Sequence, residues 1–204
     1  AGRGGGESGA VTPTLEELRQ RVAQHNRGFG RVASAIQAAP VPVVGVIEGA
    51  SMGGGFGMVC VTDVALCHES ARFGLPETGL GILPAQIAPF VMERIGFTQA
   101  RRLCLTGARF DAREAQRIGL VHEVFSDTAA LEARLAEVVQ QIRRCAPNAN
   151  AQTKRLLLRV GQAPLAQVLD EAAQMFAEAS LSDEGREGAV AFVQKRLPAW
   201  AETE

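Results

Sequence analysis

The 204-residue sequence contains no tyrosine, and aromatic residues make up only 5% of it. It also lacks a run of about 18 apolar residues, as a membrane-spanning helix needs, and a basic-then-apolar leader. No block of like charge is present, because 21 Lys and Arg and 22 Asp and Glu are interspersed, for a formal net charge of −1. We therefore expect a cytoplasmic protein that binds neither a membrane nor nucleic acid.

Clustered metal or disulfide ligands are lacking as well. The three histidines are isolated, and the four cysteines form no C-x-x-C pair: Cys60, Cys67, Cys104 and Cys145. This pattern predicts neither a disulfide framework nor a metal site. It favours small buried cysteines in a reducing compartment.

What is present is a hydrophobic fraction of 47% with 22 glycines, which suits a buried core with tight turns. Apolar β-branched runs predict buried strands at 43–49, 63–68 and 120–125. Capping boxes at Thr14 and Asp111 begin two of the predicted helices. Strands alternating with helices, followed by helices alone, predict an α/β core over 1–125 (1–13 flexible) and a helical region over 126–204.

The stretch GASMGGGFG, residues 49–57, fits G-x-S-x-G at Ser51, the nucleophile elbow of serine hydrolases. Asp111 and His122 follow in the chain order of a hydrolase triad. However, His122 lies inside a predicted strand, and Asp111 is better explained as a helix cap. Because so short a pattern often matches by chance, the serine hydrolase is the less favoured interpretation.

The glycines of the same stretch offer a second interpretation. Gly53, Gly54 and Gly55 precede a short predicted helix, where unobstructed N–H groups and the helix dipole can hold a developing oxyanion. They match neither a phosphate-binding loop nor a dinucleotide fingerprint, because the residues those motifs require do not follow. The alternative is that they only turn the chain or let helix and strand pack closely.

Glu77 is the candidate acid–base residue. It lies on the Pro- and Gly-rich stretch FGLPETGLGILP, residues 73–84, after the next predicted strand. A loop glutamate is commonly a solvated charge, but the neighbours of this one are apolar: Leu75, Pro76, Leu80 and Ile82. Partial desolvation among them would raise its proton affinity and suit it to general acid–base catalysis.

Together these stretches resemble the enoyl-CoA hydratase/isomerase (crotonase) family, from Pro42 to the C-terminus. VPVVGVIEGASMGGGFGMVCVTDVALC is similar to the family's glycine-helix segment, and FGLPETGLGILPA to its second catalytic segment. LTGARFDAREAQRIGLVHEVF and EGREGAVAFVQKR are similar to the segments that follow. The resemblance implies a ββα spiral core and a C-terminal helical region used for trimerisation.

The resemblance also implies residue roles. Gly54 would donate one oxyanion N–H to the thioester carbonyl, and Glu77 would act on water and on the substrate α-carbon. Phe192 and Lys195 would reach a neighbouring subunit's acyl pocket and CoA phosphate, although a solvated helix charge is the alternative for Lys195. The implied substrate-binding set is Gly53, Gly57, Leu80, Pro84, Phe192 and Lys195.

The sequence departs from the family pattern at two places. Gly57 stands where the family has its first catalytic glutamate, which excludes a two-carboxylate hydratase and would clear space for a branched or bulky acyl group. The sequence also begins at, or just after, the loop that supplies the second oxyanion N–H and part of the CoA site. We therefore expect that its natural N-terminal portion is missing.

The favoured function is an enoyl-CoA hydratase, most similar to the methylglutaconyl-CoA and isohexenylglutaconyl-CoA types of leucine and acyclic terpene breakdown. A Δ3,Δ2-enoyl-CoA isomerase is the alternative, because one glutamate suffices to move a proton between two carbons. A non-catalytic scaffold of the same fold is a third. No cofactor is expected, since coenzyme A is part of the substrate, and the implied assembly is a homotrimer or a dimer of trimers.

Overall fold

The computed structural model describes residues 13–201, so the expected flexible start lies, apart from Pro13, outside the described residues. A parallel sheet in the order β1-β3-β6 contains the three strands that the apolar runs predict. These strands are β1 (Val44–Ile47), β3 (Val64–His68) and β6 (Glu123–Phe125). The predicted alternation of strands and helices is confirmed, although each strand is shorter than its apolar run.

A second sheet, in the order β2-β4-β5, is not predicted by the sequence patterns. Its strands have three residues each: β2 (Ala50–Met52), β4 (Arg72–Gly74) and β5 (Arg109–Asp111). β2 pairs with β4 in parallel, and β4 pairs with β5 antiparallel. Three residues are too few to show an alternating apolar pattern, so these strands can be recognised only from their pairing in the structure.

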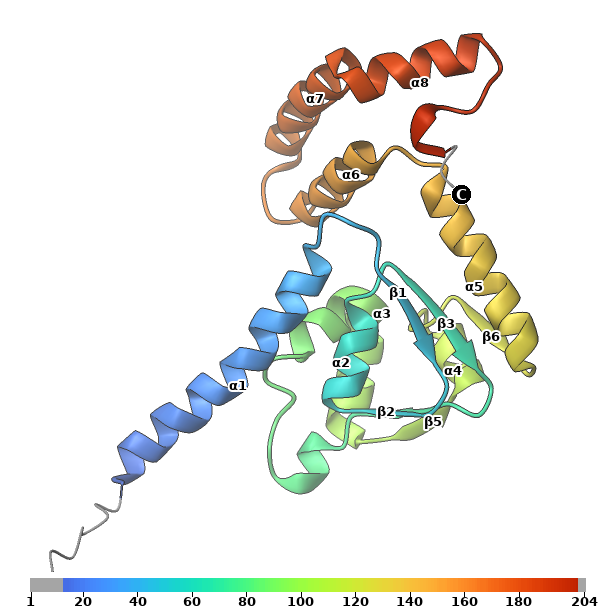
Figure 1. Ribbon diagram of the computed structural model, residues 1–204. Coiled ribbons are helices and arrows are strands. Elements are labelled where there is room, and N and C mark those ends of the chain that lie inside the picture. The colour runs from blue at the N-terminus through green and yellow to red at the C-terminus, as the bar shows by residue number, and fades with distance from the viewer. Residues whose placement is uncertain (1–12, 202–204) are drawn as a thin grey trace, which may run out of the picture.

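Two helices begin at the caps that the sequence predicts. Thr14 and Glu17 form a complete capping box before α1 (Leu15–Gln37). Asp111 caps α4 (Ala112–Arg117) by accepting a hydrogen bond from the backbone of its first turn. Figure 1 shows that α1 begins away from the sheets and approaches them with its C-terminal half.

Three further elements lie between β2 and β5. α2 (Gly54–Cys60) follows the glycines, and the 3-10 helix η1 (Glu77–Leu80) follows β4. The long helix α3 (Ala88–Thr106) comes next. Its backbone is non-helical at Gly96, with a φ of 74° and a ψ of 160°, so the helix is kinked there.

The C-terminal part of the chain is helical, with α5 packed against β3 and β6. Figure 1 shows α6, α7 and α8 as an arm set apart from the sheets, at the far end from η1. Lys154 of α6 ties this arm to the core through an ion pair of 2.7 Å with Asp63. The elements are α5 (Thr128–Arg143), α6 (Pro147–Arg159), α7 (Leu165–Leu181), α8 (Asp183–Val193) and the 3-10 helix η2 (Ala199–Ala201).

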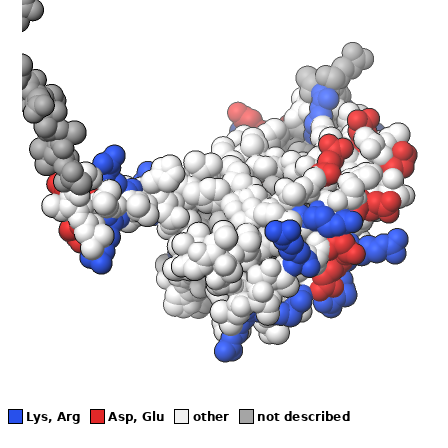
Figure 2. Space-filling model, turned by 90° about the horizontal axis from the view of Figure 1, so that it is seen from below, with Lys and Arg blue, Asp and Glu red and all other residues white. Residues whose placement is uncertain are grey.

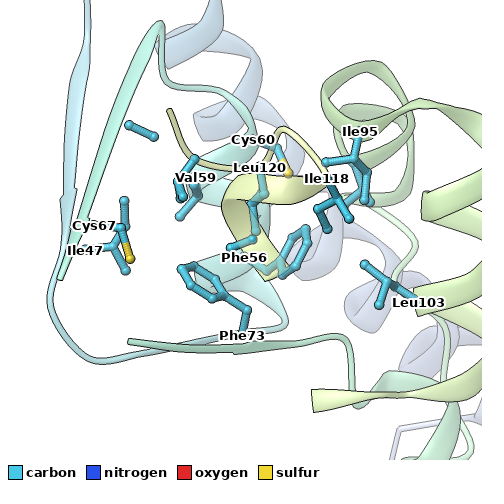
Figure 3. Close-up of a cluster of buried hydrophobic side chains, with 14 of the residues drawn as sticks. Ile47, Phe56, Val59, Cys60, Cys67, Phe73, Ile95, Leu103, Ile118 and Leu120 are labelled. Atoms are coloured by element: carbon cyan, nitrogen blue, oxygen red, sulfur yellow. The ribbon is translucent and has the colours of Figure 1, made fainter. Parts of the chain in front are cut away.

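The hydrophobic core lies between the sheets and helices α2, α3 and α4 (Figure 3). Phe56 of α2 and Phe73 of β4 are fully buried and meet edge to face, with ring centroids 6.4 Å apart. Phe110 of β5 stacks on Phe73 at 5.7 Å. Because each such side chain contributes about 1.5–3 kcal/mol when buried, the core holds α2 and β4 firmly against each other.

The surface of the molecule is unevenly charged. Figure 2 shows charged side chains on one side of the body and on α1, with a broad surface free of Lys, Arg, Asp and Glu between them. Large apolar side chains are exposed in the segment from η1 to α3: Leu80, Ile82, Leu83, Met92 and Phe97. Such surface is typical of contact sites for other molecules. Within residues 13–201, no helix is long and apolar enough to cross a membrane.

Candidate active site

Two parallel strands bring the two predicted catalytic segments to one edge of the smaller sheet. β2 and β4 run side by side, with Met52 opposite Gly74. β2 continues into the glycines and α2, and β4 continues through Leu75 and Pro76 into η1. The Gly53 N–H donates a hydrogen bond of 3.0 Å to the Gly74 carbonyl, so the segments stay in contact as they leave the sheet. The carboxyl ends of parallel strands are where α/β proteins commonly bind ligands.

The start of α2 is built from glycine because its backbone requires glycine. Gly53 has a φ of 51° and a ψ of −115°, a conformation that L side chains rarely adopt. No side chain of the described chain caps this helix, and its first N–H groups have no intrahelical partner. α2 is anchored in the core by Phe56, Val59 and Cys60.

Glu77 lies over this helix start. Its Oε1 is 2.8 Å from the point where a Cβ on Gly53 would lie. Its Oε2 is buried and has no hydrogen-bond partner within residues 13–201. An unpaired buried polar atom costs about 1–3 kcal/mol and is rare in folded proteins. The structure thus brings together Glu77, Gly53 and Gly54, as the resemblance implies.

Hydrogen bonds around η1 fix the backbone that carries Glu77. The Ile82 N–H donates to the Glu77 carbonyl at 3.1 Å, and Thr78 Oγ1 donates to the Cys104 carbonyl of α3 at 3.0 Å. Burial, and after it the negative charge of Glu77, raise the pKa of the Cys104 thiol. Cys104 is therefore a neutral neighbour of the Glu77 carboxyl group.

The side chains expected to bury Glu77 do so only in part. Leu75 is fully buried, but Leu80 and Ile82 are 71% and 58% exposed. Leu80, at the end of η1, and Ile82, just after it, therefore lie mostly at the surface of the described chain. The start of α2 at Gly53 lies against the carboxyl group instead.

Gly57 is buried, and the space beside it is already filled. A Cβ at this position would collide with Cγ2 of Ile87 and lie 2.8 Å from the Ile87 Cβ, with the Phe29 ring 3.6 Å away. The expectation that Gly57 clears space for an acyl group is therefore wrong, because Ile87 occupies that space. Two further side chains reach α2 although no local motif in the sequence marks them: Phe29 of α1 and Ile87, the residue before α3.

Three substrate-binding candidates remain: Pro84, Phe192 and Lys195. Pro84 precedes α3, and its carbonyl accepts hydrogen bonds from the first turn of that helix. Phe192, which is 86% exposed, and Lys195, which is also exposed, lie at the end of α8. This end belongs to the arm that Figure 1 shows apart from η1. The fold does not bring Phe192 or Lys195 to Glu77 of the same chain.

The three residues of the possible hydrolase triad have structural roles in the fold. Ser51 lies within β2, is 7% exposed, and is not at the strand-to-helix turn that a nucleophile elbow requires. His122 Nδ1 accepts a hydrogen bond of 2.9 Å from the Ala65 N–H. Burial, and then the charge of Arg94, lower the pKa of His122, so the ring stays neutral in this role. With Asp111 capping α4, these residues do not form a triad.

Comparisons with known proteins place the chain in a family. The sequence profile described as enoyl-CoA hydratase/isomerase matches residues 10–203. A probable mitochondrial enoyl-CoA hydratase 2 of Arabidopsis thaliana is 34% identical, over 81% of this chain and 55% of the relative. The 2,3-dehydroadipyl-CoA hydratase of Escherichia coli is 32% identical, over 93% and 75%. A peroxisomal Δ(3,5)-Δ(2,4)-dienoyl-CoA isomerase of Arabidopsis thaliana is 30% identical, over 91% and 66%.

The chain therefore belongs to the enoyl-CoA hydratase/isomerase family, and it spans between 55% and 75% of the length of these relatives. Pseudomonas aeruginosa AtuE superposes with a TM-score of 0.86 at 56% identity, over 93% of this chain and 76% of that one. An enoyl-CoA hydratase/isomerase from Marinobacter aquaeolei superposes with a TM-score of 0.88 at 47% identity, over 96% and 73%. The predicted fold class, a crotonase-like α/β core with C-terminal helices, is confirmed.

Proposed function

We propose that this chain carries the active site of an enoyl-CoA hydratase, which adds water across the α,β double bond of an acyl-CoA. The observation that carries the proposal is the position of Glu77, with Oε1 beside Gly53 and Oε2 buried without a partner in the described residues. This carboxyl group and the N–H groups of α2 supply the base and the oxyanion donor that hydration needs. Coenzyme A takes part only as a portion of the substrate.

In the proposed reaction, the thioester carbonyl oxygen accepts the Gly54 N–H at the positive end of α2. Glu77 takes a proton from water while the water oxygen bonds to the β-carbon, and the double-bond electrons move onto the thioester oxygen as an enolate. Glu77 then returns the proton to the α-carbon as the carbonyl re-forms. One oxyanion donor of this kind contributes about 10²–10³ in rate.

Glu77 handles both proton transfers in this proposal, because position 57 is a glycine covered by Ile87. Water and proton then reach the double bond from the same face. We propose a branched glutaconyl-type acyl chain, of which the methylglutaconyl and isohexenylglutaconyl thioesters are examples. The support for this finer assignment is the resemblance of the segments GGGFG and FGLPETGLGILP.

Turnover of a panel of α,β-enoyl-CoAs in ¹⁸O-labelled water tests the proposed reaction. We expect 3-hydroxyacyl-CoA with ¹⁸O on the β-carbon, and the highest kcat/KM for a branched glutaconyl thioester. Mass spectrometry of the products, with a no-protein control, measures both. Unlabelled products with a migrated double bond would instead support the isomerase alternative, which the single carboxyl group and the similarity to a dienoyl-CoA isomerase favour.

We also propose that the chain acts as a homotrimer or a dimer of trimers in which α8 of one subunit completes the site of its neighbour. Phe192 and Lys195 are exposed at the end of α8, and Figure 1 shows α8 in the arm apart from η1, which suits them to the site of another chain. The Lys195 ammonium is suited to a CoA phosphate as a point charge. The uncharged surface of Figure 2 supports contact with further copies.

Mixing two defective variants tests this arrangement. Lys195→Ala is expected to raise KM for an enoyl-CoA about tenfold, the effect of losing roughly 1.4 kcal/mol of binding. In mixed oligomers of Lys195→Ala with Glu77→Gln, some sites combine an intact Glu77 with an intact Lys195 from the neighbour. Activity at low substrate concentration is then expected to exceed the sum of the separate variants. A strictly additive mixture, with subunit exchange verified by mass spectrometry, would contradict action between subunits.

A further inference from the structure

A stripe of three glycines at the start of α2 faces Glu77 and two apolar side chains. Gly53, Gly54 and Gly57 follow one another at helical spacing, which puts them on the same side of the helix. Glu77 Oε1 lies against Gly53, and a ring carbon of Phe29 lies 3.1 Å from the Cβ position of Gly54. At Gly57 the same ring is joined by Ile87. The carboxyl group and the apolar pair thus cover consecutive parts of one surface.

The apolar pair is held in place from outside the glycine stripe. Ile87 is 4% exposed and donates its N–H to the Pro84 carbonyl at 3.2 Å, directly before α3. Phe29 is half-buried in the C-terminal half of α1 and packs against the core. The Gln86 side chain contacts Gly30 of the same helix. Both residues are therefore positioned by contacts that do not depend on a substrate.

We propose that Phe29 and Ile87 form the wall that selects the acyl chain by its size at the third carbon. The inference rests on the proposed function, which places the thioester carbonyl at the Gly54 N–H. The acyl carbons that follow the carbonyl then lie between Glu77 and this wall. Because Ile87 fills the space that a side chain at position 57 would take, the size of Ile87 sets the upper limit on the branch that the β-carbon of the proposed substrates can carry.

The direct test compares two substrates that differ by one methyl group on the third carbon, crotonyl-CoA and 3-methylcrotonyl-CoA. Ile87→Ala is expected to shift the ratio of their kcat/KM values at least tenfold toward the methylated substrate, since one methylene in an apolar pocket changes discrimination about 10–200-fold. Phe29→Leu is expected to shift it in the same direction. Ile95→Ala, the same change at a buried site farther along α3, is expected to leave the ratio unchanged.

Binding of saturated thioesters separates this inference from the proposed function. If the wild type hydrates none of the enoyl-CoAs, the proposed function fails, but the wall still predicts that Ile87→Ala shifts the Kd ratio of butyryl-CoA to isovaleryl-CoA toward the branched ligand. Ile87→Val, a smaller change, gives a smaller shift in the same direction if the alanine variant is unstable. An unchanged Kd ratio, or equal shifts for Ile87→Ala and Ile95→Ala, would overturn the proposal that Phe29 and Ile87 select the acyl chain.

Thermal stability tests the packing of Ile87 against Gly57 separately from substrate selection. Gly57→Ala is expected to lower Tm by about 5 °C, the shift typical of an overpacked core position in a chain of this size, because the added Cβ meets Ile87. In the Ile87→Ala background the same change is expected to cost nothing, since the space is then free. Additive losses of Tm in the double variant would show that the two residues do not share this space, and would overturn the wall.

Discussion

Glu77→Gln is expected to lower kcat for enoyl-CoA hydration by about 10³-fold. General acid–base groups typically contribute 10²–10⁴, and here one carboxyl group takes the proton from water and returns it to the α-carbon. Glutamine keeps the size and polarity of the side chain, so KM and the free energy of unfolding should change little. Steady-state kinetics and urea denaturation measure the two quantities.

The matched control for this variant is Glu132→Gln, the same change at an exposed position of α5. It is expected to keep wild-type kcat, because α5 packs against β3 and β6 rather than against the N-terminal end of α2. A Glu77→Gln variant with near wild-type turnover would contradict both the assigned base and the proposed function. Equal losses in the two variants would point to a general effect of charge.

Gly53→Ala is expected to lower kcat/KM about 10²-fold. The added Cβ would lie 2.8 Å from Glu77 Oε1, and displacing a catalytic group by about 1 Å can cost this much. The backbone at Gly53, with a φ of 51° and a ψ of −115°, also suits only glycine, so a further loss of about 1–3 kcal/mol in the free energy of unfolding is expected.

Gly55→Ala provides the comparison for this second variant. Gly55 lies two residues further along, within α2, where an added Cβ would make an ordinary contact of 3.5 Å with Ser51 Oγ. Replacing a helical glycine by alanine stabilises a protein by about 0.5–1 kcal/mol, so this variant should keep its activity and gain stability. If Gly53→Ala behaved like Gly55→Ala, the close approach of Glu77 to the helix start would be wrong.

The two segments that form the candidate site could be found in the sequence because their signals are local. The run of glycines before a short apolar helix, and a glutamate on a Pro- and Gly-rich stretch, each lie within a few residues. The capping box of Thr14 and Glu17 and the strand from Val64 to His68 are equally local, and the structure confirms them.

What could not be predicted depends on residues far apart in the sequence. The strands β2 and β4 have three residues each, too few for an alternating pattern, yet their pairing brings Gly53 beside Glu77. The space beside Gly57 is another such case. A glycine in a sequence indicates a missing side chain, but it does not indicate whether a neighbour such as Ile87 has taken the space.

The sequence by itself determined the kinds of chemical group available: a glutamate on a Pro- and Gly-rich stretch, a run of glycines before a short helix, and a helical C-terminal region. Only the tertiary structure decided that the Glu77 carboxyl group lies against that helix start, that Phe29 and Ile87 cover the rest of it, and that Phe192 and Lys195 lie apart from it. The physical reason is that side-chain type and helix caps act over a few residues, whereas strand pairing and core packing act between distant segments of the chain.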